Sequence, residues 1–143
     1  MGGELLARIL VVDDDDAIRL VLRIALEYNG YEVVEAQNGC EGLQRYEAVP
    51  VDLVITDMQM PQMDGLQMLI ELRRRSPKAK VIAISGRWQA LTAAGTCSAQ
   101  RIFEKPFRVR EILGAVAELI STPDPSQDRA YSMAHASHLQ TCV

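Results

Sequence analysis

Five polar residues of this sequence follow directly after short apolar runs, and their side chains together could form a reactive site. They are Asp13, Asp14, Asp57, Ser85 and Lys105. Three carboxylates at close range raise one another's pKa unless a divalent cation neutralises them, and oxygen ligands that leave room for water and phosphate suit Mg²⁺. A carboxylate can attack phosphorus to give an acyl phosphate, while a metal ion and a lysine hold the charge that collects on the phosphoryl oxygens. The residue types therefore predict phosphoryl transfer with Mg²⁺, provided that the fold brings them together.

The apolar runs before these residues have the length and composition of buried β-strands. The predicted strands are Arg8–Val12, Tyr31–Ala36, Leu53–Asp57, Val81–Ile84 and Arg101–Phe103. The second strand is short and more polar than the first, so we expect it at an edge of the sheet.

Segments with helical periodicity lie between the strands. Predicted helices follow a cap at Asp15 or Asp16, follow a cap at Asn38, begin near Gly65 and run from Val109 to Ile120, with a weaker pattern over residues 87–100. Strands that alternate with helices through short loops predict a doubly wound α/β domain with one five-stranded parallel sheet. Because parallel strands end at the same edge of a sheet, the five polar residues are expected to meet there.

Length, charge and composition exclude several classes of function. The 143 residues suit one domain, and a net charge of −4 argues against a surface that binds nucleic acid directly. No apolar run approaches the roughly 20 residues needed to cross a bilayer, and the first residues given lack the pattern of a secretory leader, so we expect a cytoplasmic protein without membrane insertion. The odd number of cysteines, 3, suits a reducing compartment. Residues 121–143 lack periodicity, and we interpret them as a flexible tail or the stub of a linker.

Four ordered motifs resemble the receiver domain of two-component response regulators: ILVVDDDDAIR, LVITDMQMPQMDG, IAISG and FEKPF. The resemblance covers roughly residues 7–120, within a domain expected over residues 1–120, and implies a flavodoxin-like sheet in the order 2-1-3-4-5. It also implies Asp57 as the phosphoacceptor, Ser85 as the switch hydroxyl and Lys105 as the phosphate-binding lysine. The implied Mg²⁺ ligands are Asp14 directly, Asp13 largely through water, Asp57 and the backbone carbonyl of Gln59. A cis peptide bond is implied between Lys105 and Pro106.

The resemblance further implies a signalling domain rather than an enzyme with an external substrate. Its phosphoryl donor would be a histidine kinase or a histidine phosphotransfer protein. Its output would pass to a downstream protein partner, or to an output domain missing from this sequence. Ile102 departs from the family pattern, since an aromatic residue often stands three positions before the lysine. Phe103 cannot simply replace it, because successive side chains of a strand point to opposite faces.

Two other functions compete with this interpretation. Asp13 and Asp15 give the D-x-D spacing of a haloacid-dehalogenase-like phosphatase, with Asp13 as its nucleophile, although that reading leaves the DMQMPQMDG motif unexplained. A receiver-like binding module that is never phosphorylated is the second alternative. Residue by residue, Asp57 could merely fix a turn, and Ser85 could merely bond to the backbone.

Overall fold

One parallel sheet forms the centre of the molecule. The computed structural model describes residues 6–60, 65–87 and 99–121. The five strands are β1 (Arg8–Val12), β2 (Glu32–Ala36), β3 (Leu53–Asp57), β4 (Val81–Ser85) and β5 (Arg101–Glu104). Their order in the sheet is β2-β1-β3-β4-β5, which confirms the predicted doubly wound, flavodoxin-like α/β fold and places β2 at an edge.

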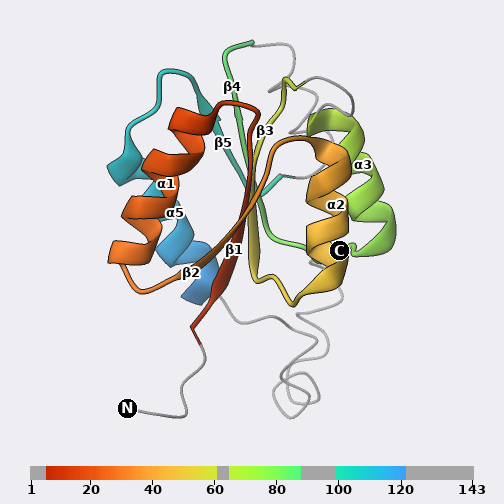
Figure 1. Cartoon of the computed structure of the whole chain (residues 1–143), viewed down its shortest axis with the longest axis horizontal. Helices are drawn as coiled ribbons and strands as arrows, with labels where there is room; N and C mark the ends of the chain where they lie inside the picture. The colour runs from red at the N-terminus through yellow and green to blue at the C-terminus, as the bar shows by residue number, and fades with distance from the viewer. Residues whose placement is uncertain (1–5, 61–64, 88–98, 122–143) are drawn as a thin grey trace, which may run out of the picture.

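Helices cover both faces of the sheet. They are α1 (Asp16–Tyr28), α2 (Gly39–Ala48), α3 (Gly65–Arg75) and α5 (Val109–Ser121). Figure 1 shows α1 and α5 on one side of the sheet and α2 and α3 on the other. Most of the weak helical pattern over residues 87–100 lies outside the described residues, as do Pro61 to Asp64 and the expected tail beyond Ser121.

Side-chain caps begin the first two helices, as the sequence predicts. The Asp15 carboxylate accepts hydrogen bonds from the amides of Ala17 (2.9 Å) and Ile18 (3.3 Å). The Asn38 side chain accepts one from the amide of Glu41 at 2.8 Å. Such bonds satisfy amides that have no partner within the helix, and they fix where each chain segment leaves the edge of the sheet.

Two apolar layers pack on the sheet, and alternate residues of each strand enter opposite layers. In β1, Ile9 and Val11 join the layer under α1 and α5, whereas Leu10 and Val12 join the layer under α2 and α3. The helices differ from the predicted pattern in one respect. Val21 recurs at helical spacing with Ile18, Leu22, Ala25 and Leu26, which predicts a place in the core, yet 48% of Val21 is exposed, because the sheet covers a narrower face of α1 than this apolar stripe occupies.

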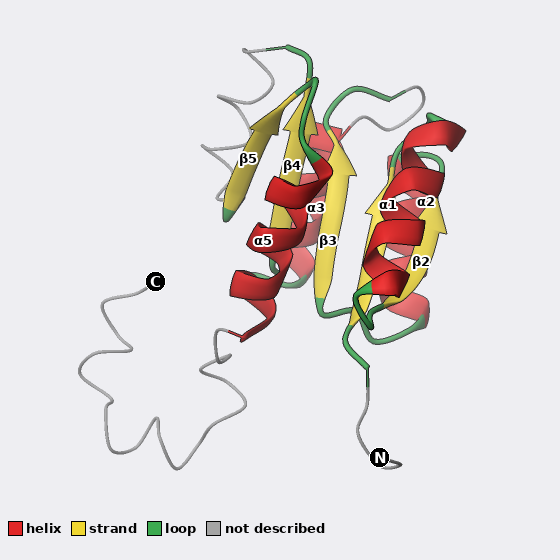
Figure 2. Ribbon diagram, turned by 90° about the vertical axis from the view of Figure 1, so that its left-hand side faces the viewer, coloured by secondary structure: helices red, strands yellow, loops and turns green. Residues whose placement is uncertain are grey.

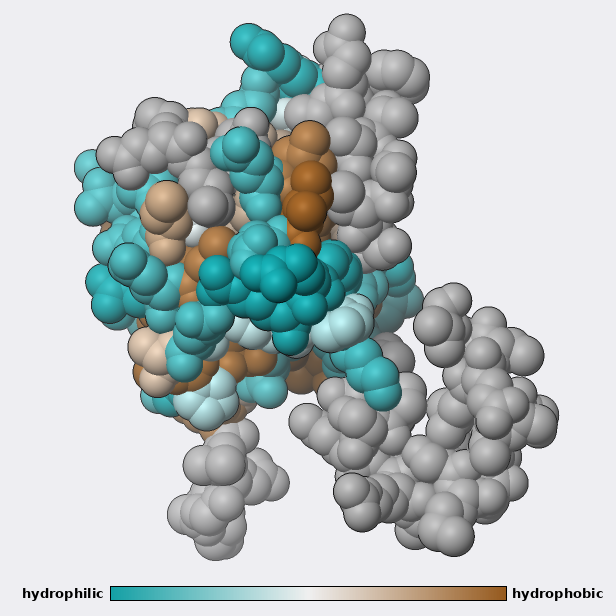
Figure 3. Space-filling model, turned by 90° about the vertical axis from the view of Figure 1, so that its right-hand side faces the viewer, coloured by the Kyte–Doolittle hydropathy of each residue, from teal (hydrophilic) through white to brown (hydrophobic). Residues whose placement is uncertain are grey.

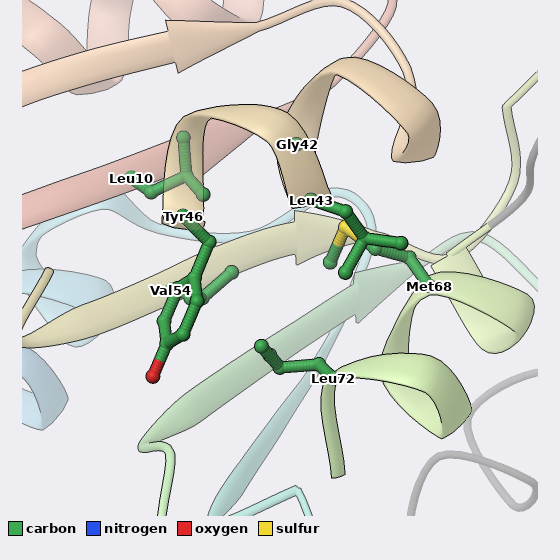
Figure 4. Close-up of a pocket in the computed structure, with 7 residues that line it drawn as sticks. All are labelled: Leu10, Gly42, Leu43, Tyr46, Val54, Met68 and Leu72. Atoms are coloured by element: carbon green, nitrogen blue, oxygen red, sulfur yellow. The ribbon is translucent and has the colours of Figure 1, made fainter. Parts of the chain in front are cut away.

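The layer under α2 and α3 contains a small crevice that belongs to the core. Its lining is Leu10, Gly42, Leu43, Tyr46, Val54, Met68 and Leu72, and Figure 4 shows these residues between the two helices and the sheet. A Cβ atom on Gly42 would lie 2.9 Å from the sulfur of Met68, so glycine lets α2 pack closely there. The outer surface on this side is largely hydrophilic, with small hydrophobic patches between polar side chains (Figure 3).

None of the helices in the described ranges combines the length and the apolar character that a membrane span requires.

Candidate functional site

Strand register brings the polar residues to one edge of the sheet. Val12 of β1 pairs with Thr56 of β3, so the residues that follow them, Asp13 and Asp57, lie side by side. Asp57 pairs with Ile84 of β4, which places Ser85 one step further along. All the arrowheads in Figure 2 point to this edge.

Backbone hydrogen bonds continue beyond the paired residues and hold the strand ends together. The Asp13 amide donates to the carbonyl of Ala36 at 3.1 Å, the Met58 amide to Ile84 at 2.9 Å, and the Lys105 amide to Ser85 at 2.9 Å. The site is therefore supported by the sheet and not by its loops alone, which restricts how far its side chains can move apart.

Three carboxylates form the centre of the site. One oxygen from each of Asp13, Asp14 and Asp57 lies within 4.8 Å of the others. Asp13 and Asp57 are only 3% and 4% exposed, while Asp14 faces solvent. Burial raises the pKa of Asp13 from 3.8 to about 6. The charge of Asp57 also raises this pKa, whereas the Asp15 amide and Lys105 lower it. Burial likewise raises the pKa of Asp57, although Lys105 and the Gln59 amide favour its ionised form.

Lys105 supplies the positive charge of the site. Its ammonium nitrogen lies 3.4 Å from one oxygen of Asp57 and 3.8 Å from one oxygen of Asp13. A single cation shared between two carboxylates lowers their mutual repulsion without cancelling it. The Lys105–Pro106 peptide bond is cis, which confirms the prediction from the resemblance.

Ser85 and Gln59 are joined by a hydrogen bond beside the carboxylates. The fully buried Ser85 hydroxyl donates to the side-chain oxygen of Gln59 at 3.1 Å and accepts from the amide of Arg87 at 3.0 Å. The Gln59 amide in turn donates to Asp57 at 3.2 Å. Ser85 thus has a side-chain partner within the site as well as a backbone one, so bonding to the backbone alone does not account for it.

Gly65 allows α3 to start against the backbone of β3. A Cβ atom at this position would lie 2.2 Å from the carbonyl oxygen of Asp57 and 2.5 Å from the Cα atom of Met58. Both atoms belong to the backbone and cannot rotate away. The close approach therefore requires glycine, and it ties the position of α3 to the residue that carries the central carboxylate.

The chemistry of this donor set fits Mg²⁺. The three carboxylates offer oxygen ligands only, and the exposure of Asp14 leaves one side open to water or a phosphate group. Burial raises the pKa values of Asp13 and Asp57 despite the opposing charge of Lys105, so the site disfavours their ionised forms. A divalent cation bound there would favour these forms.

Arg19 belongs to this neighbourhood, and sequence reasoning missed it. Its guanidinium donates to the backbone carbonyl of Asp13 at 2.6 Å. The signal available in the sequence was its spacing, because Arg19, Leu22 and Leu26 fall on one face of a helix. The structure shows that all three are buried. A charged residue at a core position indicates a specific partner.

Comparison with known proteins identifies the family of this chain and supports its fold. The family model of the response regulator receiver domain matches residues 9–117. The chain belongs to this family. It is 34% identical over 117 residues to the chemotaxis protein CheY of Bacillus subtilis, a match that covers 80% of this chain and 98% of that protein. It is 35% identical over 130 residues to the response regulator MprA of Mycolicibacterium vanbaalenii, and this match covers 88% of the chain. The chain spans only about half the length of MprA, since the match covers 56% of that protein.

Solved receiver domains share the architecture. A CheY-like receiver domain protein from Methanospirillum hungatei superposes with a TM-score of 0.77 at 31% identity, covering 81% of this chain and 94% of the other. The response regulator TrrA of Thermotoga maritima, solved in complex with Mg²⁺ and BeF, gives a TM-score of 0.74 at 34% identity, covering 80% and 99% of the two chains. The chain is therefore a phosphoacceptor signalling domain of the CheY-like fold.

The two competing functions are not favoured by these findings. A haloacid-dehalogenase-like phosphatase needs the Asp15 carboxylate for proton transfer, whereas in this receiver domain that group caps α1. The binding-module alternative gives no role to the buried Asp13–Asp57 pair or to Lys105.

On β5, Ile102 is 40% exposed while Phe103 packs inward against the layer under α1 and α5, so Phe103 does not take the place of the missing aromatic residue.

Proposed function

We propose that this receiver domain accepts a phosphoryl group on Asp57, with Mg²⁺ held by Asp13, Asp14, Asp57 and the backbone carbonyl of Gln59. The observation that carries the proposal is the geometry around Asp57: a buried carboxylate beside a second one, with the Lys105 ammonium 3.4 Å away. We place this function within residues 1–120.

The proposed step is an in-line transfer from a phosphohistidine. An oxygen of Asp57 attacks the phosphorus, the bond between phosphorus and the histidine nitrogen breaks, and its electron pair stays on the imidazole. Lys105 would bind an oxygen of the incoming phosphoryl group, and the Ser85 hydroxyl would donate to another oxygen after leaving Gln59. Mg²⁺ when bound supplies the charge neutralisation that the carboxylates lack. The domain would thus catalyse its own phosphorylation and, slowly, its own dephosphorylation.

An exposed apolar stripe on α1 supports the proposal that the phosphoryl donor is a protein. Its members are Leu20 (55% exposed), Val21 (48%), Ile24 (59%) and Tyr28 (90%). A helix that carries apolar residues on its outer face as well as its buried face is suited to a partner. Because α1 begins three residues after Asp13, a protein seated on this stripe reaches the site. We infer that the histidine kinase or phosphotransfer protein docks here, and that a downstream partner reads the surface around β5 and α5.

Intact-mass measurement after incubation with acetyl phosphate and Mg²⁺ tests the acceptor assignment. The wild-type protein should gain one phosphoryl group, and the Asp57→Asn variant should gain none. Asp52→Asn is the matched control, because Asp52 lies just before the other end of the same strand and should be labelled like the wild type. Equal labelling of wild type and Asp57→Asn would disprove the assignment, as would a wild type that stays unlabelled.

A further inference from the structure

Arg19 is a buried cation that the phosphoryl chemistry does not itself use. Only 9% of it is exposed, and no other arginine or lysine in the described segments is buried to this extent. It lies on the face of α1 that packs on the sheet, with Leu22 and Leu26. Burial of a guanidinium is unfavourable unless its N–H groups find acceptors, so its partners indicate what it is for.

The guanidinium of Arg19 joins three separate elements. Its Nε donates to Glu35 of β2 at 3.0 Å, one terminal nitrogen donates to the Asp16 carboxylate at the start of α1, and the other donates to the carbonyl oxygen of Asp13 at 2.6 Å. Glu35 is shared with Arg23, whose terminal nitrogen lies 2.6 Å from its other oxygen. Two carboxylates therefore balance the charge of Arg19, and its third bond goes to the backbone of the acidic loop.

That third bond acts on the peptide unit between Asp13 and Asp14. A peptide unit is planar, so the direction of the Asp13 carbonyl also fixes the Asp14 amide and the start of the Asp14 backbone. The Asp13 amide is held by Ala36, and its carboxylate accepts from the Asp15 amide at 2.9 Å. Arg19 is the side chain that completes this support.

We propose that Arg19 is a positioning residue that orients Asp13 and Asp14 relative to one another for binding a divalent cation. The inference rests on the proposed function of the site. Arg19 acts through the Asp13 carbonyl and takes no part in the transfer of the phosphoryl group. Its charge is already matched by Asp16 and Glu35, so its contribution is geometric.

Calorimetric titration of the whole chain with Mg²⁺ tests the proposal without phosphorylation. Arg19→Met should weaken Mg²⁺ binding roughly ten- to hundredfold, the usual effect of removing a group that orients a metal ligand. Arg19→Lys should recover part of the affinity, because an ammonium can still donate to the Asp13 carbonyl but cannot form the fork. Arg23→Met is the matched control: Arg23 shares Glu35 and the same helix but bonds to Glu27 rather than to Asp13, so its Mg²⁺ affinity should match the wild type.

Urea unfolding in EDTA on the same variants separates positioning from general destabilisation. Equal losses of Mg²⁺ affinity in Arg19→Met and Arg23→Met would overturn the proposal, and so would wild-type affinity in both Arg19 variants. If Arg19→Met does not fold, Arg19→Lys decides: unchanged affinity overturns the proposal and a clear reduction supports it. A wild-type protein that binds no Mg²⁺ would overturn the proposed metal site as well, whereas normal wild-type binding with unaffected Arg19 variants would overturn the role of Arg19 alone.

Discussion

Replacing Asp13 by asparagine should stabilise the receiver domain at about pH 7.5 when no divalent cation is present. Burial raises the pKa of this carboxyl from 3.8 to about 6, so at pH 7.5 it is ionised in surroundings that disfavour its charge. A shift of about two pH units corresponds to about 3 kcal/mol. This is the amount by which the ionised Asp13 carboxylate destabilises the folded state, and asparagine removes the charge while keeping an oxygen for the Asp15 amide.

The sign of the pH dependence follows from the direction of the shift. The folded protein holds the Asp13 proton up to a higher pH than the unfolded chain does, so between about pH 4 and pH 6 it binds more protons. The contribution of Asp13 to the free energy of unfolding therefore falls as the pH rises through this interval and stays low above it. Asp57 acts in the same direction, because burial raises its pKa too.

Urea unfolding followed by circular dichroism, at about pH 4 and about pH 7.5, measures the effect. In EDTA, Asp13→Asn should exceed the wild type by up to about 3 kcal/mol at the higher pH, and the two proteins should converge at the lower pH. Excess Mg²⁺ should stabilise the wild type and remove the advantage, because the cation binds the folded carboxylates. A variant no more stable than the wild type in EDTA at the higher pH would refute the reasoning.

Three further predictions concern α3, the lysine and α1. Gly65→Ala should destabilise the fold by roughly 2–3 kcal/mol in urea unfolding, because the added Cβ atom would meet the Asp57 carbonyl. Gly114→Ala is the control: its Cβ atom would meet nothing within 4 Å, so this variant should be neutral or slightly stabilising. Equal effects of the two substitutions would contradict this account. Lys105→Met should slow labelling by acetyl phosphate roughly a hundredfold, as intact mass would show, and unchanged labelling would exclude the lysine from the reaction. Ile24→Ser should slow transfer from a phosphorylated histidine protein in a radiolabel assay but leave labelling by acetyl phosphate unchanged, and equal slowing by both donors would argue against docking on α1.

The strand ends were predictable because one physical rule governs all of them. Apolar runs that stop at Asp13, Asp57 and Ser85 identify buried parallel strands, and such strands end at one edge of a sheet. The caps at Asp15 and Asn38 followed from equally local chemistry. The order of the strands depended on the family resemblance, because short connections alone do not fix which strand lies beside which.

Contacts between distant segments were beyond the reach of sequence patterns. The periodicity of α1 places Val21 with the core residues, and only the packed structure shows that the sheet covers a narrower face. The bond from Arg19 to the Asp13 carbonyl needs the rotamer of a long side chain, which spacing does not define. The bond from Ser85 to Gln59 likewise joins residues 26 positions apart that meet only when β3 and β4 pair.

Under the proposed function, phosphorylation of Asp57 would replace the partners that Lys105 and Ser85 have in this structure. Lys105 lies between Asp57 and Asp13, and the Ser85 hydroxyl donates to Gln59. A phosphoryl group on Asp57 would present oxygens to both groups, so Lys105 would turn toward it and Ser85 would exchange its neutral amide acceptor for a charged one. Charge-assisted hydrogen bonds are roughly twice as strong as neutral ones, so the exchange favours the phosphorylated arrangement. Because the Arg87 amide donates to the same hydroxyl, movement of Ser85 would also move the backbone at Arg87, and we propose this as the link between the acceptor chemistry and the surface.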